Sequence, residues 1–171
     1  MSLRIPLVPH PEHPPHGVEG IDVTADIRRG ASILAYRVTG RMPLLPAPAA
    51  PERTDGLWRR TCFELFIRPE GGEGYFEFNF SPSTQWAAYR FHGYREGMRE
   101  QPIAAPAIEP LEDGIRVRLD LGGLPGGAWK AGITAVIEEA DGAKSYWSVL
   151  HGPAAPDFHA PAGFAIDLPA R

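Results

Sequence analysis

The segment from Leu57 to Met98 constrains the possible fold of this chain more than any other part of its sequence. It contains three runs in which apolar and polar residues alternate, at 61–67, 75–80 and 86–91. Alternation with a period of two predicts β-strands that bury one face, and the sequences PEGGEG and SPSTQ between the runs are typical of turns. The segment therefore predicts an antiparallel meander, with Phe76, Phe78 and Phe80 on the apolar face of its middle strand.

The same pattern recurs along the rest of the chain. Further strands are predicted at 20–28, 33–39, 114–121, 131–138, 146–150 and 164–168. The 19 glycines and 19 prolines are spread along the sequence, and this favours short strands and turns over helices. Together these features predict an all-β chain, a jelly-roll-like β-sandwich of two antiparallel sheets with little or no helix.

A length of 171 residues favours one domain. We expect residues 1–17 to form an extended N-terminal segment rich in Pro and His, and residues 18–171 to form the sandwich domain. His10, His13 and His16 recur every third residue and would line one side of a polyproline helix, as a surface strap or as a metal-capturing edge. The proline-rich stretch 41–56 is expected to be a long loop, and long loops in small domains are often functional.

Composition and motifs narrow the function classes. A net charge of −4 and a pI near 5.9 argue against nucleic-acid binding. No apolar run reaches the length of a signal peptide or a membrane span, so we expect no membrane association and a cytoplasmic location. The single cysteine, Cys62, is expected to be a buried thiol. No nucleotide-binding, nucleophile-elbow or metalloprotease motif occurs, and no pattern specifies an oligomeric state.

Three polar residues share the non-apolar face of the predicted hairpin: Glu64, Glu77 and Asn79. Depending on the register, Glu64 lies opposite Glu77, or opposite Asn79 with Glu77 on the diagonal. Two carboxylates this close could bind sugar hydroxyls or a cation, or act as an acid and a base. The alternative is a surface network in which nearby arginines neutralise them, with Arg60, Arg68 and Arg90 available.

The chain has four tryptophans: Trp58, Trp86, Trp129 and Trp147. Flat aromatic faces stack on sugar rings, whereas a tryptophan taken alone is more often part of a core. Trp86 is close in sequence to Gln85 and Arg90, and Trp58 precedes Arg60 by two residues. The proximity of tryptophans to polar side chains favours ligand binding.

The C-terminal loop contains His151, Asp157 and His159. Imidazole and carboxylate groups on a loop could contact a ligand, ligate a metal or hold a general base. Alternatively, Asp157 and His159 bond to the backbone and fix the loop. The spacing does not distinguish these possibilities.

Four segments resemble the DOMON-like superfamily, in the branch similar to the family 9 carbohydrate-binding module. They are LWRRTCFELFI, YFEFNFSPSTQWAAYRF, GYREGM and SYWSVLHGPAAPDFHAPAGF. The resemblance implies a β-sandwich that binds a sugar or haem. In sugar-binding members, tryptophans clamp the ring and polar side chains contact the hydroxyls. The matching candidates here are Trp86, Glu64, Glu77, Asn79 and Arg90, with Trp147 as a second aromatic face.

The first hypothesis is therefore a non-catalytic module that binds a saccharide or a sugar-like molecule. Its candidate contacts are Trp58, Arg60, Glu64, Glu77, Asn79, Trp86, Arg90, Trp147, His151, Asp157 and His159. The second is an enzyme acting on a sugar-derived metabolite through Glu64 and Glu77 or through the C-terminal loop. The third is a haem- or metal-binding domain, with Met42, Met98 and His92 as further ligand types. The sequence requires no cofactor, and haem and divalent cations remain compatible with it.

Overall fold

The computed structural model describes residues 2–170, which form twelve β-strands and two short 3₁₀-helices. The strands are β1 (Leu3–Pro9), β2 (Val18–Asp26), β3 (Ala31–Gly40), β4 (Cys62–Pro69), β5 (Tyr75–Phe80), β6 (Trp86–Phe91), β7 (Arg99–Glu100), β8 (Ala107–Leu111), β9 (Gly114–Asp120), β10 (Trp129–Glu138), β11 (Lys144–Ser148) and β12 (Ile166–Leu168). The 3₁₀-helices are η1 (Leu57–Arg59) and η2 (Pro161–Gly163). No helix within residues 2–170 is long and apolar enough to cross a membrane.

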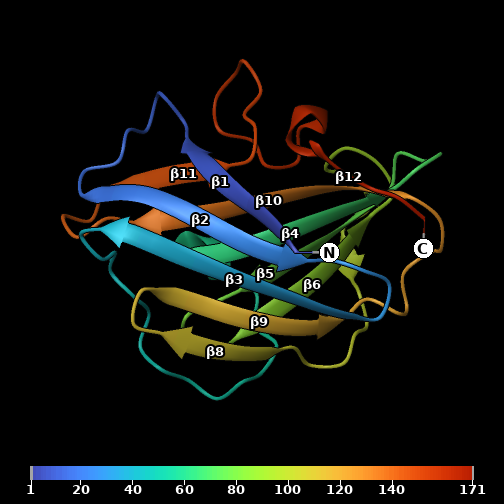
Figure 1. The fold of residues 1–171 in the computed structure, drawn as a ribbon, viewed down its shortest axis with the longest axis horizontal. Coiled ribbons are helices and arrows are strands. Elements are labelled where there is room, and N and C mark those ends of the chain that lie inside the picture. The colour runs from blue at the N-terminus through green and yellow to red at the C-terminus, as the bar shows by residue number, and fades with distance from the viewer. Residues whose placement is uncertain (1, 171) are drawn as a thin grey trace.

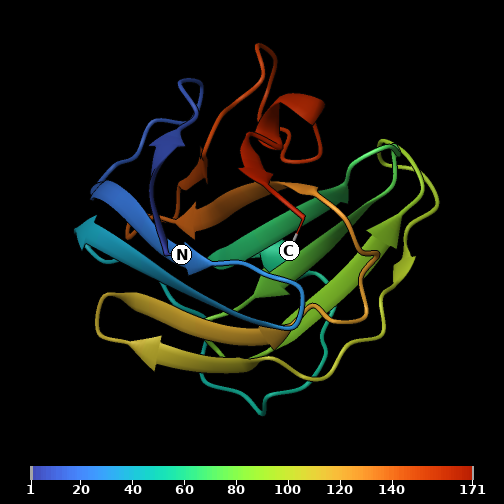
Figure 2. The same cartoon turned by 45° about the vertical axis from the view of Figure 1, so that its right-hand side comes forward.

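The strands form two antiparallel layers that face each other (Figure 1). Sheet A has the order β8-β9-β3-β2-β1, and sheet B has the order β7-β6-β5-β4-β10-β11, with β12 pairing to one end of β10. Figure 2 shows the two layers from a second direction, with the loops before β2 and after β11 rising at one end. The predicted all-β sandwich with little helix is confirmed.

Strand β1 joins the two sheets. Its residues 3–7 pair with β2, and Val8 and Pro9 pair with β11. The N-terminal segment is therefore an integral strand followed by a loop, and it is continuous with the sandwich. The sequence pattern did not indicate this strand because Pro6 and Pro9 lack the N–H of a regular ladder. Pro6 is compatible with β1 because only β2 pairs with it there.

The core fills the space between the sheets. The predicted apolar faces of β4 and β5 lie in it, with Leu65 and Phe78 fully buried. Trp86, Trp129 and Trp147 also belong to this core. Alternation along these strands places their remaining side chains on the outer face of sheet B.

Most predicted strands occur at the expected positions, within a few residues at their ends. The segment from Gly97 to Pro110, in which the sequence pattern predicts no strand, contains β7 and most of β8. Strand β8 is an edge strand that pairs only with β9, so Pro110 is tolerated in it. Its burial pattern does not alternate, and this explains why periodicity did not predict it.

Candidate functional site

The outer face of sheet B is polar along its middle. Glu64 on β4 lies opposite Asn79 on β5, and Glu77 lies opposite Phe66 and therefore diagonal to Glu64. This is the second of the two predicted registers. Thr134 on β10 lies on the other side of Glu64 and donates a hydrogen bond of 3.0 Å from its hydroxyl to Oε2 of Glu64.

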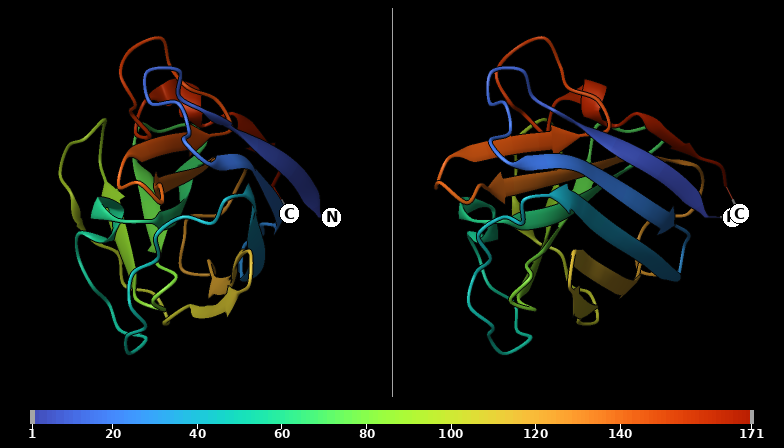
Figure 3. Two further views of the ribbon diagram at one scale, coloured as in Figure 1. Left: turned by 90° about the vertical axis from the view of Figure 1, so that its left-hand side faces the viewer. Right: turned by 60° about the vertical axis from the view of Figure 1, so that its left-hand side comes forward.

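This face is not open to solvent, because three segments cover it. They are η1 with the loop before it, the turn after β6, and the loop between β11 and β12. The left panel of Figure 3 shows η1 and the turn after β6 on the side of sheet B that faces away from sheet A. A second apolar cluster packs beneath these segments: Phe66, Tyr75, Ala87, Tyr89, Phe91 and Phe164.

A cavity of about 490 Å³ remains between these segments and the sheet. Its floor contains Glu64, Glu77, Val136, Lys144 and Tyr146, from β4, β5, β10 and β11. Its walls contain Trp58 and Arg59 from η1, Phe91, Arg95 and Met98 at and after the end of β6, and Pro156, Phe158 and His159 from the C-terminal loop. The cavity therefore combines aromatic walls with two buried carboxyl groups.

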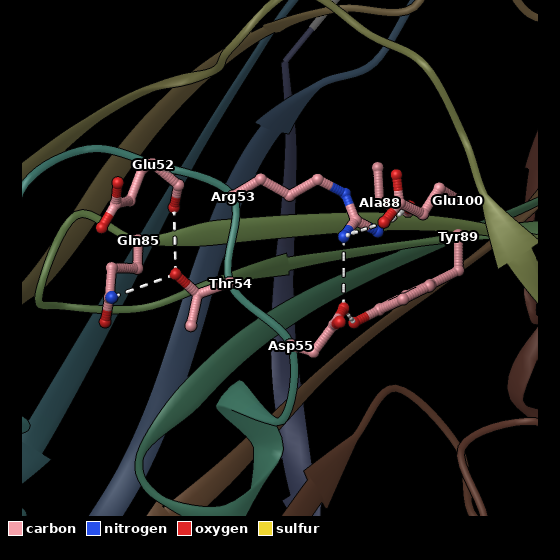
Figure 4. Close-up of polar contacts among 8 residues, drawn as sticks. All are labelled: Glu52, Arg53, Thr54, Asp55, Gln85, Ala88, Tyr89 and Glu100. Atoms are coloured by element: carbon pink, nitrogen blue, oxygen red, sulfur yellow. Dashed lines mark hydrogen bonds and ion pairs between the residues drawn. The ribbon is translucent and has the colours of Figure 1, made fainter.

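The loop before η1 is fastened to the sheet by Arg53 (Figure 4). The Arg53 guanidinium donates to the carbonyl of Ala88 on β6 at 3.1 Å and to Glu100 on β7 at 2.9 Å. It also donates to Asp55 at 3.2 Å, and the Tyr89 hydroxyl donates to the same Asp55 oxygen at 2.5 Å. The Trp58 ring packs edge-on against the Tyr89 ring, with centroids 6.4 Å apart. These contacts fix the position of Trp58 at the wall of the cavity.

The opposite wall is held by His159. The Tyr75 hydroxyl lies 2.7 Å from Nδ1 of His159 and accepts a hydrogen bond of 3.1 Å from the Arg95 backbone N–H. The Tyr75 proton is therefore free to be donated to Nδ1, and this tautomer directs the Nε2–H of His159 toward Glu77, 3.6 Å away. Asp157 fixes the loop by pairing with Arg95 at 2.7 Å, by accepting from Tyr94, and by accepting from the His159 N–H at 3.1 Å.

Burial dominates the electrostatics of the cavity floor. It raises the pKa of Glu64 well above the usual range, and the neighbouring Glu77 raises it further, while the Thr134 hydrogen bond opposes the change. Burial raises the pKa of Glu77 to about 7, against the opposing effects of the Asn79 amide and of Arg95. Burial also lowers the pKa of His159 to about 4, and Arg95 adds to this effect. At neutral pH the floor therefore holds a partly ionised Glu77 and a neutral His159, and burial favours the protonated form of Glu64.

Four of the predicted contact residues line the cavity: Trp58, Glu64, Glu77 and His159. Two others lie beside it: Asn79 is fully buried next to Glu64, and Asp157 fixes the wall. Asp157 bonds to the backbone, as the structural alternative for the C-terminal loop predicts, while His159 faces the cavity.

The other predicted contacts lie away from the cavity. Trp86 pairs with Phe80 and Trp147 pairs with Ala135, so both rings point into the core and neither forms a platform on the outer face. Arg90 is exposed opposite Phe76, on the inner face of β6. Arg60 pairs with Glu138 at 3.1 Å. The proposed network of Arg60, Arg68 and Arg90 around the glutamates is therefore absent from the described residues.

His151 also lies outside the cavity lining. Its Nε2 lies 2.7 Å from the carbonyl of Val8, and its ring packs edge-on against His10. His10 in turn bonds through Nε2 to the carbonyl of Ala154 at 2.8 Å. Within residues 2–170, no three His, Cys, Asp or Glu side chains gather closely enough to hold a metal ion. Both histidines thus link the N-terminal loop to the C-terminal loop.

Several cavity residues were not predicted. Tyr146 could have been found, since it alternates with Trp147 and therefore faces the opposite side of β11. Arg95 and Phe158 belong to loops without periodicity, so no sequence signal places them beside β4 and β5. The buried thiol expected at Cys62 is confirmed, and burial raises its pKa well above the usual range.

The fold and its covered cavity define a β-sandwich with a small-molecule-sized site on the outer face of one sheet. Solved structures share this fold. A candidate carbohydrate-binding protein of Bacteroides uniformis matches over 96% of this chain and 84% of its own, with a TM-score of 0.70 and 15% identity. A family 9 carbohydrate-binding module of Caldicellulosiruptor kristjanssonii, in complex with glucose, matches over 89% of this chain and 76% of its own, with a TM-score of 0.50 and 12% identity.

No protein-family model matches the sequence, and no curated protein matches it. At the identities of the two structural matches, the similarity establishes the fold alone. The chain has the β-sandwich fold of the family 9 carbohydrate-binding module.

Proposed function

We propose that this protein binds a small saccharide in the cavity over sheet B. The observation that carries this proposal is the combination of an exposed aromatic wall and a buried polar floor in one cavity of about 490 Å³. Trp58 is 39% exposed although its edge is packed against Tyr89, so one ring face is available to a ligand. Sites of this volume are typical for small molecules.

The chemistry of the lining suits a sugar. An aromatic ring presents a negative face to the C–H groups of a pyranose, and Trp58, Phe158 and Tyr146 offer such rings. Carboxyl and imidazole groups form hydrogen bonds with hydroxyls, and Glu64, Glu77 and His159 supply them. The glucose complex of the family 9 module with the same fold supports this ligand class.

We also propose a superfamily and a cellular location for this protein. The four segments that resemble the DOMON-like superfamily support membership in its branch similar to the family 9 module. The absence of a signal-like apolar run in the sequence supports a cytoplasmic location.

The proposal is tested by calorimetric titration with glucose, galactose, xylose and cellobiose. We expect saturable binding of at least one sugar, and Trp58→Ala should weaken it at least tenfold, about 1.4 kcal/mol. Ile33→Ala is the matched control, because Ile33 is 45% exposed on β3 of sheet A. Absence of binding to all four sugars, or equal affinity of wild type and Trp58→Ala, would contradict the proposal.

A further inference from the structure

The cavity floor holds two carboxyl groups, although neutral hydrogen-bonding groups would be enough to bind sugar hydroxyls. Glu64 is 2% exposed and Glu77 is 5% exposed, and they project from neighbouring strands to the same face of sheet B. Within the described residues, neither forms an ion pair with a lysine or an arginine. A binding site for neutral hydroxyls could use amides instead, at a lower cost of burial.

The environments of the two groups differ. Glu64 is the more enclosed and accepts a hydrogen bond from Thr134 on one oxygen. Glu77 faces the Nε2 of His159 at 3.6 Å, and burial raises the pKa of Glu77 to about 7 and that of Glu64 well above its usual range. Two close carboxyl groups raise each other's pKa, so one can stay protonated and act as an acid while the other is ionised and acts as a base.

We propose that the cavity also catalyses the interconversion of the α and β anomers of the reducing sugar that it binds, with Glu77 as the base and Glu64 as the acid. This inference rests on the proposed saccharide binding. Spontaneous anomer exchange needs a proton to leave the C1 hydroxyl and another to reach the ring oxygen O5. Both oxygens are bonded to C1, so they lie on the same edge of the sugar ring. When that edge lies over two neighbouring carboxyl groups, the C1 hydroxyl and O5 can each face one of them.

The steps balance without any further reactant. The Glu77 carboxylate takes the proton of the C1 hydroxyl, the C1–O5 bond breaks, O1 becomes the aldehyde oxygen, and the Glu64 carboxyl gives its proton to O5. The open-chain aldehyde rotates about its C1–C2 bond. In the reverse direction, O5 attacks the other face of C1 and returns its proton to Glu64, while O1 takes the proton from Glu77. Both residues end in their starting states.

The same geometry disfavours hydrolysis of a glycoside. Glycoside hydrolases place their two carboxyl groups on opposite sides of the scissile bond, to protonate the leaving group and to attack or activate water. Here both groups rise from one sheet face, and the wall opposite them contains Trp58 and Phe158. We therefore expect ring opening of a free sugar and no release of an alcohol from a glycoside.

The charged and titratable groups around the pair come from several neighbouring elements: Cys62 on β4, Tyr75 on β5, Tyr89 on β6, Arg95 after β6, Lys144 and Tyr146 on β11, Arg59 on η1, and Asp157 and His159 in the C-terminal loop. His159 is neutral at pH 7 because its pKa is about 4. Arg95 is paired with Asp157. Glu77 titrates near neutrality, so the rate should rise with pH as Glu77 ionises.

The test measures the approach of freshly dissolved α-D-glucose, α-D-galactose and α-D-xylose to anomeric equilibrium by NMR, with and without the protein, alongside calorimetric binding. For a sugar that binds, we expect the exchange between its α and β anomers to be at least ~100-fold faster in the bound sugar than in the free sugar. Glu77→Gln and Glu64→Gln should each reduce this at least tenfold, measured with the sugar at saturation and with thermal unfolding showing a folded protein. Glu73→Gln, an exposed acid in the turn between β4 and β5, is the control and should match wild type.

The outcomes of this test distinguish the inference of anomer exchange from the proposed saccharide binding. Binding without acceleration would overturn this inference and leave the proposed function in place. Failure of all three sugars to bind would overturn this inference, and failure of cellobiose to bind as well would overturn the proposed function. Wild-type rates in Glu64→Gln or Glu77→Gln would contradict the assigned acid or base, and release of methanol from methyl α-D-glucoside would show hydrolysis instead.

Discussion

At the scale of single residues, the buried glutamate Glu77 makes stability depend on pH. Its pKa is raised from 4.5 to about 7 in the folded chain. The folded state therefore binds more protons than the unfolded state between these values, and stability is lost as the pH rises through them. The shift corresponds to about 3 kcal/mol.

We predict that Glu77→Gln gains about 3 kcal/mol in unfolding free energy, relative to wild type, between pH 4 and pH 8. His159 has the opposite dependence, because its lowered pKa removes stability as the pH falls from 6.5 through about 4. His159 contributes this dependence only below about pH 6.5, so the change in the difference between pH 6.5 and pH 8 reports Glu77. Urea unfolding at several pH values measures the effect, and a difference that does not change with pH would contradict it. Glu73→Gln serves as the exposed control.

Substitutions of two tryptophans should separate effects on stability from effects on sugar binding. Trp86 is buried in the core, so Trp86→Ala should cost ~3–5 kcal/mol of stability. Trp58 is exposed, and Trp58→Ala should change stability by less than ~1 kcal/mol. We expect only the second substitution to weaken sugar affinity in the folded protein. Urea unfolding combined with calorimetry distinguishes the two, and loss of binding through Trp86→Ala in a folded sample would contradict this division.

The sequence predicts the side on which a side chain lies for some strand residues and not for the tryptophans. The faces of β4 and β5 were predictable, since alternation assigns Glu64 and Glu77 to one side and Phe76, Phe78 and Phe80 to the other. The face of Trp86 depends on its pairing with Phe80, and hence on the turn that joins β5 to β6. The predicted sugar platform at Trp86 ignored this pairing. Trp58 lies in η1, where no period applies.

At the scale of elements, the loop before η1 depends on Arg53. Its side chain ties the loop to β6 and β7, and Asp55 and Tyr89 transmit this restraint to Trp58 (Figure 4). Arg53→Ala should therefore increase hydrogen exchange in residues 52–60 and weaken sugar binding severalfold, with less than ~2 kcal/mol lost in global stability.

Hydrogen-exchange mass spectrometry and calorimetry measure these effects. Arg116→Ala is the matched control, since Arg116 pairs with Glu109 on sheet A at 3.0 Å. Unchanged exchange in residues 52–60 of Arg53→Ala would show that other contacts hold the loop.

Strands were predictable from the sequence where burial of one face requires apolar and polar residues to alternate. The strands β4, β5, β6 and β9 bury one face or pack between neighbours, and their patterns are clear. Strands β1 and β8 contain prolines at positions paired on one side only, so their stability comes from the neighbouring strand and not from a local pattern. The long loop 41–56 was correctly expected to be irregular, but its anchoring to β6 depends on tertiary contacts.

At the scale of the whole molecule, β1 connects the two sheets. It pairs with β2 and then with β11, and Leu7 is buried in the core. Deletion of residues 2–9 should lower the melting temperature by at least ~6 °C, because it removes these pairings and opens the edge of the sandwich. Val8→Ala is the control, because Val8 is 52% exposed, and it should shift the melting temperature by less than ~2 °C. A deletion variant as stable as wild type would contradict the connecting role of β1.

The cavity is also a property of the whole molecule. Its floor comes from strands separated by up to about half of the chain, and its walls come from η1, the turn after β6 and the C-terminal loop. The sequence indicated the floor acids and His159, because residue types alone mark them as candidates. It could not indicate that the three segments meet over sheet B, since loop packing has no periodic signal.

The most direct test of saccharide binding in this cavity is an NMR titration of ¹⁵N-labelled protein with the sugar that binds most tightly by calorimetry. We predict saturable shifts of amide signals in β4, β5 and β10 around Glu64, Glu77 and Val136, and in residues 57–59 and 156–159, with no change in β3, β8 and β9. Shifts confined to sheet A, or no saturable shift with any sugar tested, would contradict the proposed site.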